Sequence, residues 1–227
     1  MQLNEVVPWG RSLDEYKLMF KLTADDLNKN ILGVGDGPAS ANAELTKQGG
    51  QIISIDPIYQ FTTDNIRQRL KETYTTVVEQ MLISAHNYNW TTFRDADDLG
   101  QHRMASMTLF LDDFDTGLTE GRYQHQQLPT LSFADQSFEL ALVSHLLFLY
   151  SAHLSEEFHL QSIRELLRVA TEVRIFRLLT LAGDLSPYLS TVEQQLLTWG
   201  YESERVTVAY EFQKGGNQMM RIRSVIP

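Results

Sequence analysis

The chain has 227 residues, 43% of them hydrophobic and 21% charged, a composition typical of one globular domain with an elaboration. Its formal net charge is −10 and its 19 lysines and arginines are scattered, which argues against a nucleic-acid partner because phosphate binding needs clustered cations. It has no cysteine, so disulfides, zinc ribbons and thiol nucleophiles are excluded. The composition favours a small-molecule or protein substrate.

Neither a leader peptide nor a membrane span is indicated. Residues 1–5 do not form a basic region followed by an apolar stretch, and the chain holds no run of about 18 apolar residues. We therefore expect a cytoplasmic protein with no membrane partner.

Residues 1–27 are expected to form a helical prelude to the main domain, which we place at residues 28–227. Ser12 and Glu15 match a capping box, and apolar residues then repeat at helical spacing: Leu13, Tyr16, Met19 and Phe20. A second capped turn is expected at residues 23–26. Trp9-Gly10-Arg11 adds an aromatic ring and a cation. We expect this prelude to cover a sheet edge, and a role in substrate binding is the alternative.

The next segment has the pattern of a βαβ unit with a nucleotide-type cofactor site. A short apolar strand from Ile31 runs into three glycines, at positions 33, 35 and 37, where missing side chains let backbone N–H groups approach a ligand. A helix over 39–48 and a strand over 51–55 follow. The second strand ends at Asp56, which lies 19 residues beyond Gly37, close to the roughly 20-residue spacing that places a carboxylate on ribose hydroxyls.

Two helices are predicted between this unit and the next strand. A helix over 62–84 carries one broad apolar face: Ile66, Leu70, Tyr74, Val77, Val78, Met81 and Leu82. Residues 86–122 interrupt the alternation of strand and helix, and we interpret them as an insertion containing a helix over about 98–114. Its apolar stripe indicates a core-facing helix, with a lid as the alternative: Met104, Met107, Phe110, Leu111 and Phe114.

The remaining elements alternate and end in a hairpin. We expect a strand over 138–145, a helix capped by Ser155, a strand over 172–179, and a helix from Ser186-Pro187 to Trp199-Gly200. Strands over 206–212 and 218–222 are separated by Gly215-Gly216-Asn217, which is hairpin chemistry. The sequence therefore predicts an α/β fold whose sheet ends in an antiparallel hairpin.

Over about residues 28–227 the chain resembles the class I S-adenosylmethionine-dependent methyltransferases. The resemblance rests on the loop at 31–39, on Asp56, and on Leu-Ser-Phe-Ala-Asp-Gln-Ser-Phe-Glu at 131–139, which is similar to a segment found before the fourth strand of many members. Gly-Pro-Ala-Ser, Ser-His-Leu-Leu-Phe-Leu-Tyr and Tyr-Glu-Phe-Gln-Lys-Gly-Gly-Asn look like an uncharacterised bacterial branch. The resemblance implies a Rossmann-like three-layer sandwich. Its mostly parallel sheet would have seven strands, the last antiparallel between its neighbours.

The resemblance also implies a cofactor, S-adenosylmethionine, with S-adenosylhomocysteine as product, and a set of site residues. Asp56 would bind the ribose, and an amide of Gln124 or Gln127 would meet the adenine amine. His145 would be catalytic, beside Ser144 at the end of the fourth strand. The implied cofactor-binding residues are Gly33, Gly35, Asp36, Gly37, Asp56, Pro57, Gln127 and Ser144.

Two positions in the glycine loop depart from the superfamily pattern. Gly33 stands where Asp or Glu is common, and Ala39 where a third glycine is common. Asp36 supplies a carboxylate, which we expect on a different side of the loop. This departure motivates a second hypothesis, a methyltransferase-like scaffold that binds or regulates without catalysis.

The leading hypothesis is methyl transfer to an oxygen or nitrogen of a small acceptor, with His145 as general base because imidazole titrates near neutrality. The alternative for His145 is a residue that fills the cofactor pocket. A nicotinamide-dependent oxidoreductase is a third hypothesis, compatible with Asp56 but not with the terminal hairpin. The six histidines show no metal-ligand spacing, so no metal is predicted. The arginines around the fifth strand leave a phosphate-bearing substrate open: Arg164, Arg168, Arg174 and Arg177.

Overall fold

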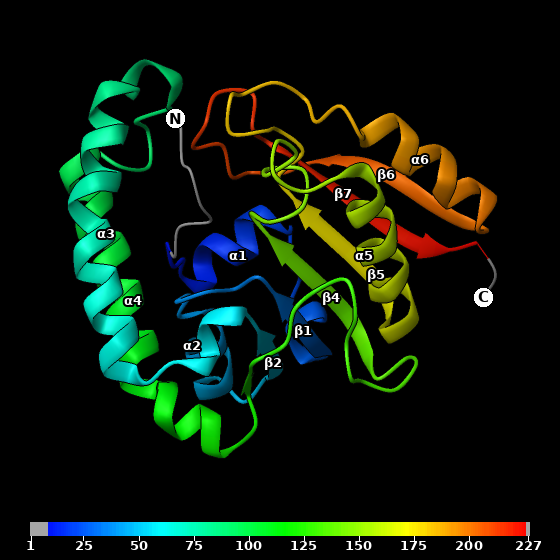
Figure 1. Ribbon diagram of the computed structural model, residues 1–227, viewed down its shortest axis with the longest axis horizontal. Helices are drawn as coiled ribbons and strands as arrows, with labels where there is room; N and C mark the ends of the chain where they lie inside the picture. The colour runs from blue at the N-terminus through cyan, green and yellow to red at the C-terminus, as the bar shows by residue number, and fades with distance from the viewer. Residues whose placement is uncertain (1–8, 226–227) are drawn as a thin grey trace.

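The backbone forms one mixed sheet with helices on both faces, the predicted three-layer sandwich (Figure 1). The structure, a computed structural model, describes residues 9–225. Residues 1–8 and 226–227 lie outside the described residues. The predictions made for the start of the prelude and for a leader peptide therefore fall outside that range.

Seven strands are found within residues 9–225, in the spatial order β3-β2-β1-β4-β5-β7-β6. Strands β1 to β5 are mutually parallel, whereas β7 runs antiparallel to both β5 and β6. This arrangement confirms the predicted fold, and it contradicts the fully parallel sheet that the oxidoreductase hypothesis required. The strands are β1 (Asn30–Val34), β2 (Gln51–Ile55), β3 (Tyr123–Gln124), β4 (Phe138–Ser144), β5 (Ala170–Phe176), β6 (Tyr201–Thr207) and β7 (Gln218–Ser224).

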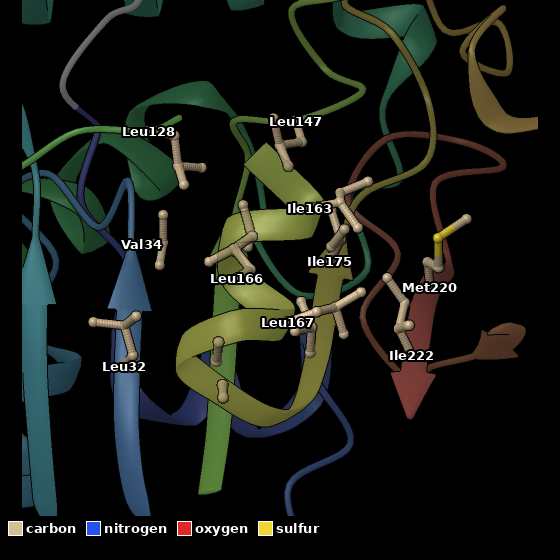
Figure 2. Packing of buried hydrophobic residues seen from close by; sticks show 14 of the residues in the cluster. Leu32, Val34, Leu128, Leu147, Ile163, Leu166, Leu167, Ile175, Met220 and Ile222 are labelled. Atoms are coloured by element: carbon tan, nitrogen blue, oxygen red, sulfur yellow. The ribbon is translucent and has the colours of Figure 1, made fainter. Parts of the chain in front are cut away.

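Helices cover the two faces of the sheet because neighbouring residues of a strand point in opposite directions. Leu32 and Val34 of β1 pack in one apolar cluster beneath α5 and α6, whereas Ile31 packs in a second cluster with α1 and α2. Figure 2 shows the first cluster, with Ile163, Leu166 and Leu167 of α5 directed onto the strands. The α-helices are α1 (Leu13–Met19), α2 (Ala41–Lys47), α3 (Thr63–Ile83), α4 (Ala96–Thr119), α5 (Glu156–Val169) and α6 (Leu189–Thr198).

Helices α3 and α4 pack on each other and connect β2 to β3. The stripe of α4 faces the core, where Met107, Phe110 and Phe114 are fully buried against Tyr59 and Tyr123. Helix α4 is longer than predicted, because Asp95 caps its first turn by accepting a hydrogen bond from the Asp98 N–H (2.8 Å). On α3 the predicted apolar face is wrong at Leu82, which is 56% exposed.

The predicted bounds of the last strands are also wrong. Strand β6 lies at Tyr201–Thr207 and not at 206–212. It is an exposed edge strand rich in charged residues, so it lacks the apolar alternation by which a strand is predicted. Val208, Tyr210 and Phe212, which produced the apolar alternation, leave the sheet and pack in the core instead. Ten residues, 208–217, therefore connect β6 and β7 in place of a tight turn. Strand β5 likewise ends at Phe176, and Leu178 and Leu179 are buried in the loop beyond it.

We expect Leu166→Ala to lower the free energy of unfolding by about 2–5 kcal/mol, because a fully buried leucine that packs α5 on the sheet is replaced by a cavity. Urea denaturation measures the change. Leu197→Ala on α6 is the matched control, because Leu197 is 70% exposed and its loss should cost about 0.5 kcal/mol or less. Equal losses for the two variants would contradict this packing.

Candidate functional site

A pocket of about 670 Å³ opens at the carboxyl ends of β1, β2, β4 and β5. In an open α/β sheet this edge is where ligands bind, because the strand order reverses there and leaves a crevice. The pocket brings together eight of the residues proposed from the sequence: Gly35, Asp36, Gly37, Asp56, Pro57, Gln127, Ser144 and His145. Gly33 is not among its lining residues.

The glycine loop forms one wall of the pocket through its backbone. Gly35 and Gly37 have φ angles of +67° and +52°, which side chains rarely tolerate. The Gly35 N–H donates to the Ile55 carbonyl oxygen (3.0 Å) and so joins the loop to the end of β2. At Gly35 an added Cβ would lie 3.1 Å from the Leu146 side chain. The loop therefore packs closely on its neighbours and presents main-chain atoms to the pocket.

Asp56 is held by two backbone amides at the end of β2. Its Oδ2 accepts from the Gly37 N–H (3.0 Å) and its Oδ1 accepts from the Ile58 N–H (2.9 Å). Pro57, which lacks an N–H, begins the short 3₁₀ helix η2 (Pro57–Gln60) that places Ile58 there. Burial raises the pKa of Asp56 to about 6, and the two amides and His125 oppose that rise. At neutral pH the carboxylate is ionised and oriented, with lone pairs left for further donors.

The Asp36 carboxylate occupies the space that a side chain at position 33 would take. A Cβ added to Gly33 would lie 1.9 Å from Asp36 Oδ2. The expectation that Asp36 lies on a different side of the loop is therefore wrong. The chain keeps a carboxylate under the glycine loop and supplies it three residues later than the superfamily pattern. Gly33 is required because the two side chains cannot both fit.

Asp36 is tied to two other elements. Ser54 Oγ of β2 donates to its Oδ2 (2.6 Å), and the Tyr16 hydroxyl of α1 donates to its Oδ1 (2.7 Å). Burial raises the pKa of Asp36 to about 6; the two hydroxyls lower it and nearby Asp56 raises it. Burial and the Asp36 charge raise the pKa of Tyr16 well above its usual value, so its phenol stays protonated and donates.

Ser144 and His145 come together where β4 ends. Ser144 Oγ and His145 Nδ1 are 3.1 Å apart, and the His145 N–H donates to the Phe176 carbonyl oxygen (2.7 Å). His145 has a φ of +55°, which turns the chain away from the strand and leaves its ring at the pocket. Burial and the charges of Arg11 and Arg177 hold the pKa of His145 well below its usual value. The imidazole is therefore neutral at pH 7.

Of the two glutamines proposed for the adenine amine, one lines the pocket. Gln127 does so, together with Gln126. Gln124 does not, because its Nε2 donates to the Gly121 carbonyl oxygen (3.0 Å) and its Oε1 accepts from Gln126 Nε2 (2.9 Å). The side chain of Gln124 therefore stabilises the segment around β3 and does not face the pocket.

Several residues of the site were not predicted to be there. Tyr16 belongs to the apolar stripe of α1 and carries no separate signal in the sequence. Arg11 and Arg177 both line the pocket, although the sequence placed Arg11 in a prelude expected to cover a sheet edge and Arg177 in a set of arginines around the fifth strand. Tyr88 and Phe212 stack with ring centroids 4.7 Å apart, and both line the pocket although 124 residues separate them in the chain. Such pairs follow from tertiary packing alone.

Neither a membrane-spanning helix nor a metal-binding cluster is found within residues 9–225. In this range no helix is long and apolar enough to cross a membrane. The same residues hold no group of three or more His, Asp or Glu side chains placed to bind a metal ion.

Comparison with known proteins identifies a relative. No protein-family model matches the chain. An uncharacterised protein of Methanocaldococcus jannaschii is 34% identical over 224 residues, 98% of each chain. The chain belongs to the same family as this archaeal protein.

Solved structures share its fold. The mitomycin 7-O-methyltransferase MmcR aligns with a TM-score of 0.50 and 10% identity over 94% of this chain and 54% of that chain. Magnesium protoporphyrin IX methyltransferase from Synechocystis PCC 6803, with bound S-adenosylmethionine, aligns with a TM-score of 0.48 and 13% identity over 93% and 78%. The chain has the class I S-adenosylmethionine-dependent methyltransferase fold, as its motifs implied.

In this methyltransferase fold, restoring the usual acid at position 33 should be harmful. We expect Gly33→Asp to lower the free energy of unfolding by about 3–5 kcal/mol, because it forces a second carboxylate against Asp36. Adding Asp36→Ala should recover much of that loss, since the new carboxylate then has the space to itself. Urea denaturation of both single variants and the double variant measures the coupling. Additive losses would show that the two positions do not share one space.

The raised pKa of Asp36 makes folding of this methyltransferase-fold domain depend on pH. Because the folded state binds this proton more tightly than the unfolded chain, the stabilisation is complete below about pH 4 and is lost as pH rises through about 6. Between pH 4 and 7 the free energy of unfolding of the wild type should fall by about 1–3 kcal/mol relative to that of Asp36→Asn. Urea denaturation at each pH measures it, with Asp64→Asn as control because that side chain is 96% exposed. Parallel profiles for wild type and Asp36→Asn would refute the assignment.

Proposed function

We propose that the chain transfers a methyl group from S-adenosylmethionine to an oxygen or nitrogen of a small-molecule acceptor. The observation that carries this proposal is the Asp56 carboxyl group, held by the Gly37 and Ile58 amides at the pocket edge. A carboxylate fixed in this way can accept hydrogen bonds from the two hydroxyls of a ribose without reorganising.

The residues of the glycine loop fit the same cofactor. At Gly37 an added Cβ would meet only Asp56 Oδ2, at 3.8 Å, so the space above the loop is open to a ligand. The cationic cofactor is also suited to a pocket end that holds Asp36 and Asp56. S-adenosylmethionine, when bound, supplies an electrophilic methyl group on a sulfonium and leaves as S-adenosylhomocysteine. Gln127 lies at the same end of the pocket and offers an amide oxygen to the adenine amine.

His145 is the residue placed to take the proton that the acceptor loses. In the tautomer whose Nδ1–H donates to Ser144 Oγ, Nε2 keeps its lone pair and is the ring nitrogen available to the acceptor. The ring is neutral at pH 7, which leaves that nitrogen able to accept a proton. Because alignment of the two reactants supplies much of the rate of an in-line displacement, few other catalytic side chains are needed.

Tyr16 and Trp9 close the pocket from the side of the N-terminal segment. Both line it, and Tyr16 is fully buried by its contact with Asp36. The prelude thus contributes to the site as well as covering the sheet. Its role in excluding water from the reacting groups is part of this proposal.

Isothermal titration of the full chain with S-adenosylmethionine and with S-adenosylhomocysteine tests the function. We expect dissociation constants of about micromolar order for the wild type. Asp56→Ala should weaken both by about 10- to 100-fold, because hydrogen bonds to a charged acceptor contribute about 1.5–3 kcal/mol. NAD should not bind.

Asp64→Ala is the matched control, because it removes an exposed carboxylate from α3 and should leave the affinity unchanged. If the wild type binds neither form of the cofactor, the proposal fails and the scaffold hypothesis takes its place. If Asp56→Ala binds as tightly as the wild type, the cofactor lies elsewhere.

A further inference from the structure

Two arginines line the pocket without a direct acidic contact among the described residues. Arg11 and Arg177 both line it, and within residues 9–225 neither forms a salt bridge. The one hydrogen bond found for each guanidinium goes to a backbone carbonyl oxygen, from Arg11 Nη1 to Trp9 (3.1 Å) and from Arg177 Nη2 to Thr180 (3.3 Å). The Nε atoms of both are buried without a partner. Each guanidinium has five N–H donors, so most of the hydrogen-bonding capacity of these two side chains is unused.

Arg11 and Arg177 are half-buried, whereas the two fully buried arginines in the described residues are paired. Arg174 contacts Asp26 and Glu172, and Arg103 contacts Glu15 and the Tyr210 hydroxyl. Burying an unpaired cation is unfavourable, and burying two near each other is more so. Burial and the charge of Arg11 accordingly lower the pKa of Arg177 to about 10. An anion bound between the two guanidiniums would offset this unfavourable free energy.

Arg177 lies away from the proposed ribose site. Asp56 follows β2 and Arg177 follows β5, and these strands are three positions apart in the sheet. Three strand spacings amount to about 14 Å. His145, at the end of β4, lies between them in strand order. Arg177 is therefore at the acceptor end of the pocket and Asp56 at the cofactor end.

The walls at the acceptor end are largely apolar. Met81 of α3, Leu149 and Leu181 line the pocket there, along with the stacked Tyr88 and Phe212. Lysine is absent from the lining. Paired guanidiniums match a planar carboxylate bidentately, and the apolar and aromatic walls beside them suit an apolar body attached to it.

We propose that Arg11 and Arg177 bind the carboxylate of the methyl acceptor, whose apolar body lies against Met81, Leu149 and Phe212. This inference rests on the proposed function and names its substrate class. The carboxylate anchors the acceptor, and a separate oxygen or nitrogen of the same molecule faces His145. Burial is the main cause of the lowered pKa of His145, and the charges of Arg11 and Arg177 add to it; an anion bound to the two arginines offsets that second part and makes His145 a stronger base.

Calorimetric titration with benzoate, in the presence of saturating S-adenosylhomocysteine, tests the site. Benzamide, a neutral molecule of nearly the same shape, is the matched ligand control. We expect benzoate to bind at least tenfold more tightly than benzamide, and Arg177→Met and Arg11→Met each to lose about tenfold in benzoate affinity. Arg177→Met should keep the wild-type affinity for S-adenosylhomocysteine.

Thermal unfolding without ligand gives a readout that does not depend on the probe. Arg177→Met should unfold at the same or a higher temperature than the wild type, because it removes an unpaired, half-buried charge. Arg174→Met, which breaks a buried pair, should lower the midpoint by roughly 10 °C.

Equal binding of benzoate and benzamide, or tighter binding of phenyl phosphate than of benzoate, would overturn the carboxylate assignment. A loss of S-adenosylhomocysteine affinity in Arg177→Met would assign the arginine to the cofactor instead. If Arg177→Met has a thermal unfolding midpoint as low as that of Arg174→Met, Arg177 stabilises the fold and does not serve as a ligand site. If benzoate binds the wild type without S-adenosylhomocysteine and the cofactor does not bind, the anion site stands and the methyl-transfer proposal alone fails.

Discussion

A buried carboxylate under the glycine loop determines how the site is assembled. Asp36 accepts hydrogen bonds from Ser54 of β2 and Tyr16 of α1, so one side chain joins the loop after β1 to the next strand and to the N-terminal helix. It also fills the space beside Gly33. A buried charge of this kind is tolerated only when its oxygens are satisfied. The loop, the strand and the helix are consequently bound to one arrangement.

The N-terminal helix is part of the site for the same reason. Its Glu15 both closes the capping box with Ser12 and accepts from Arg103 of α4 and from the Tyr210 hydroxyl. These contacts connect segments far apart in sequence, and they place Arg11, just before the helix, at the pocket. A short helix of seven residues would be marginal alone, so its position comes from these tertiary bonds.

The pocket has opposite charges at its two ends although the chain is acidic overall. Asp36 and Asp56 lie at the ends of β1 and β2, whereas Arg177 follows β5. Because parallel strands all end at one edge of the sheet, the order of the strands sets the order of the charges across the pocket. A cationic cofactor at one end and an anionic acceptor at the other would meet near His145.

The sequence by itself determined the fold class, the βαβ unit with its glycine loop, Asp56 as the strand-end acid, and Ser144 with His145 at the end of β4. These features are local: glycine spacing, apolar runs and caps are read within about 30 residues. The two-residue strand β3 and the exposed edge strand β6 carried too little apolar signal to be found. Only the tertiary structure decided that Asp36 replaces the acid missing at Gly33, and that Arg11 and Arg177 share a pocket in which neither forms a salt bridge within residues 9–225. Both depend on which side chains meet across elements distant in sequence, and spacing along the chain does not encode that.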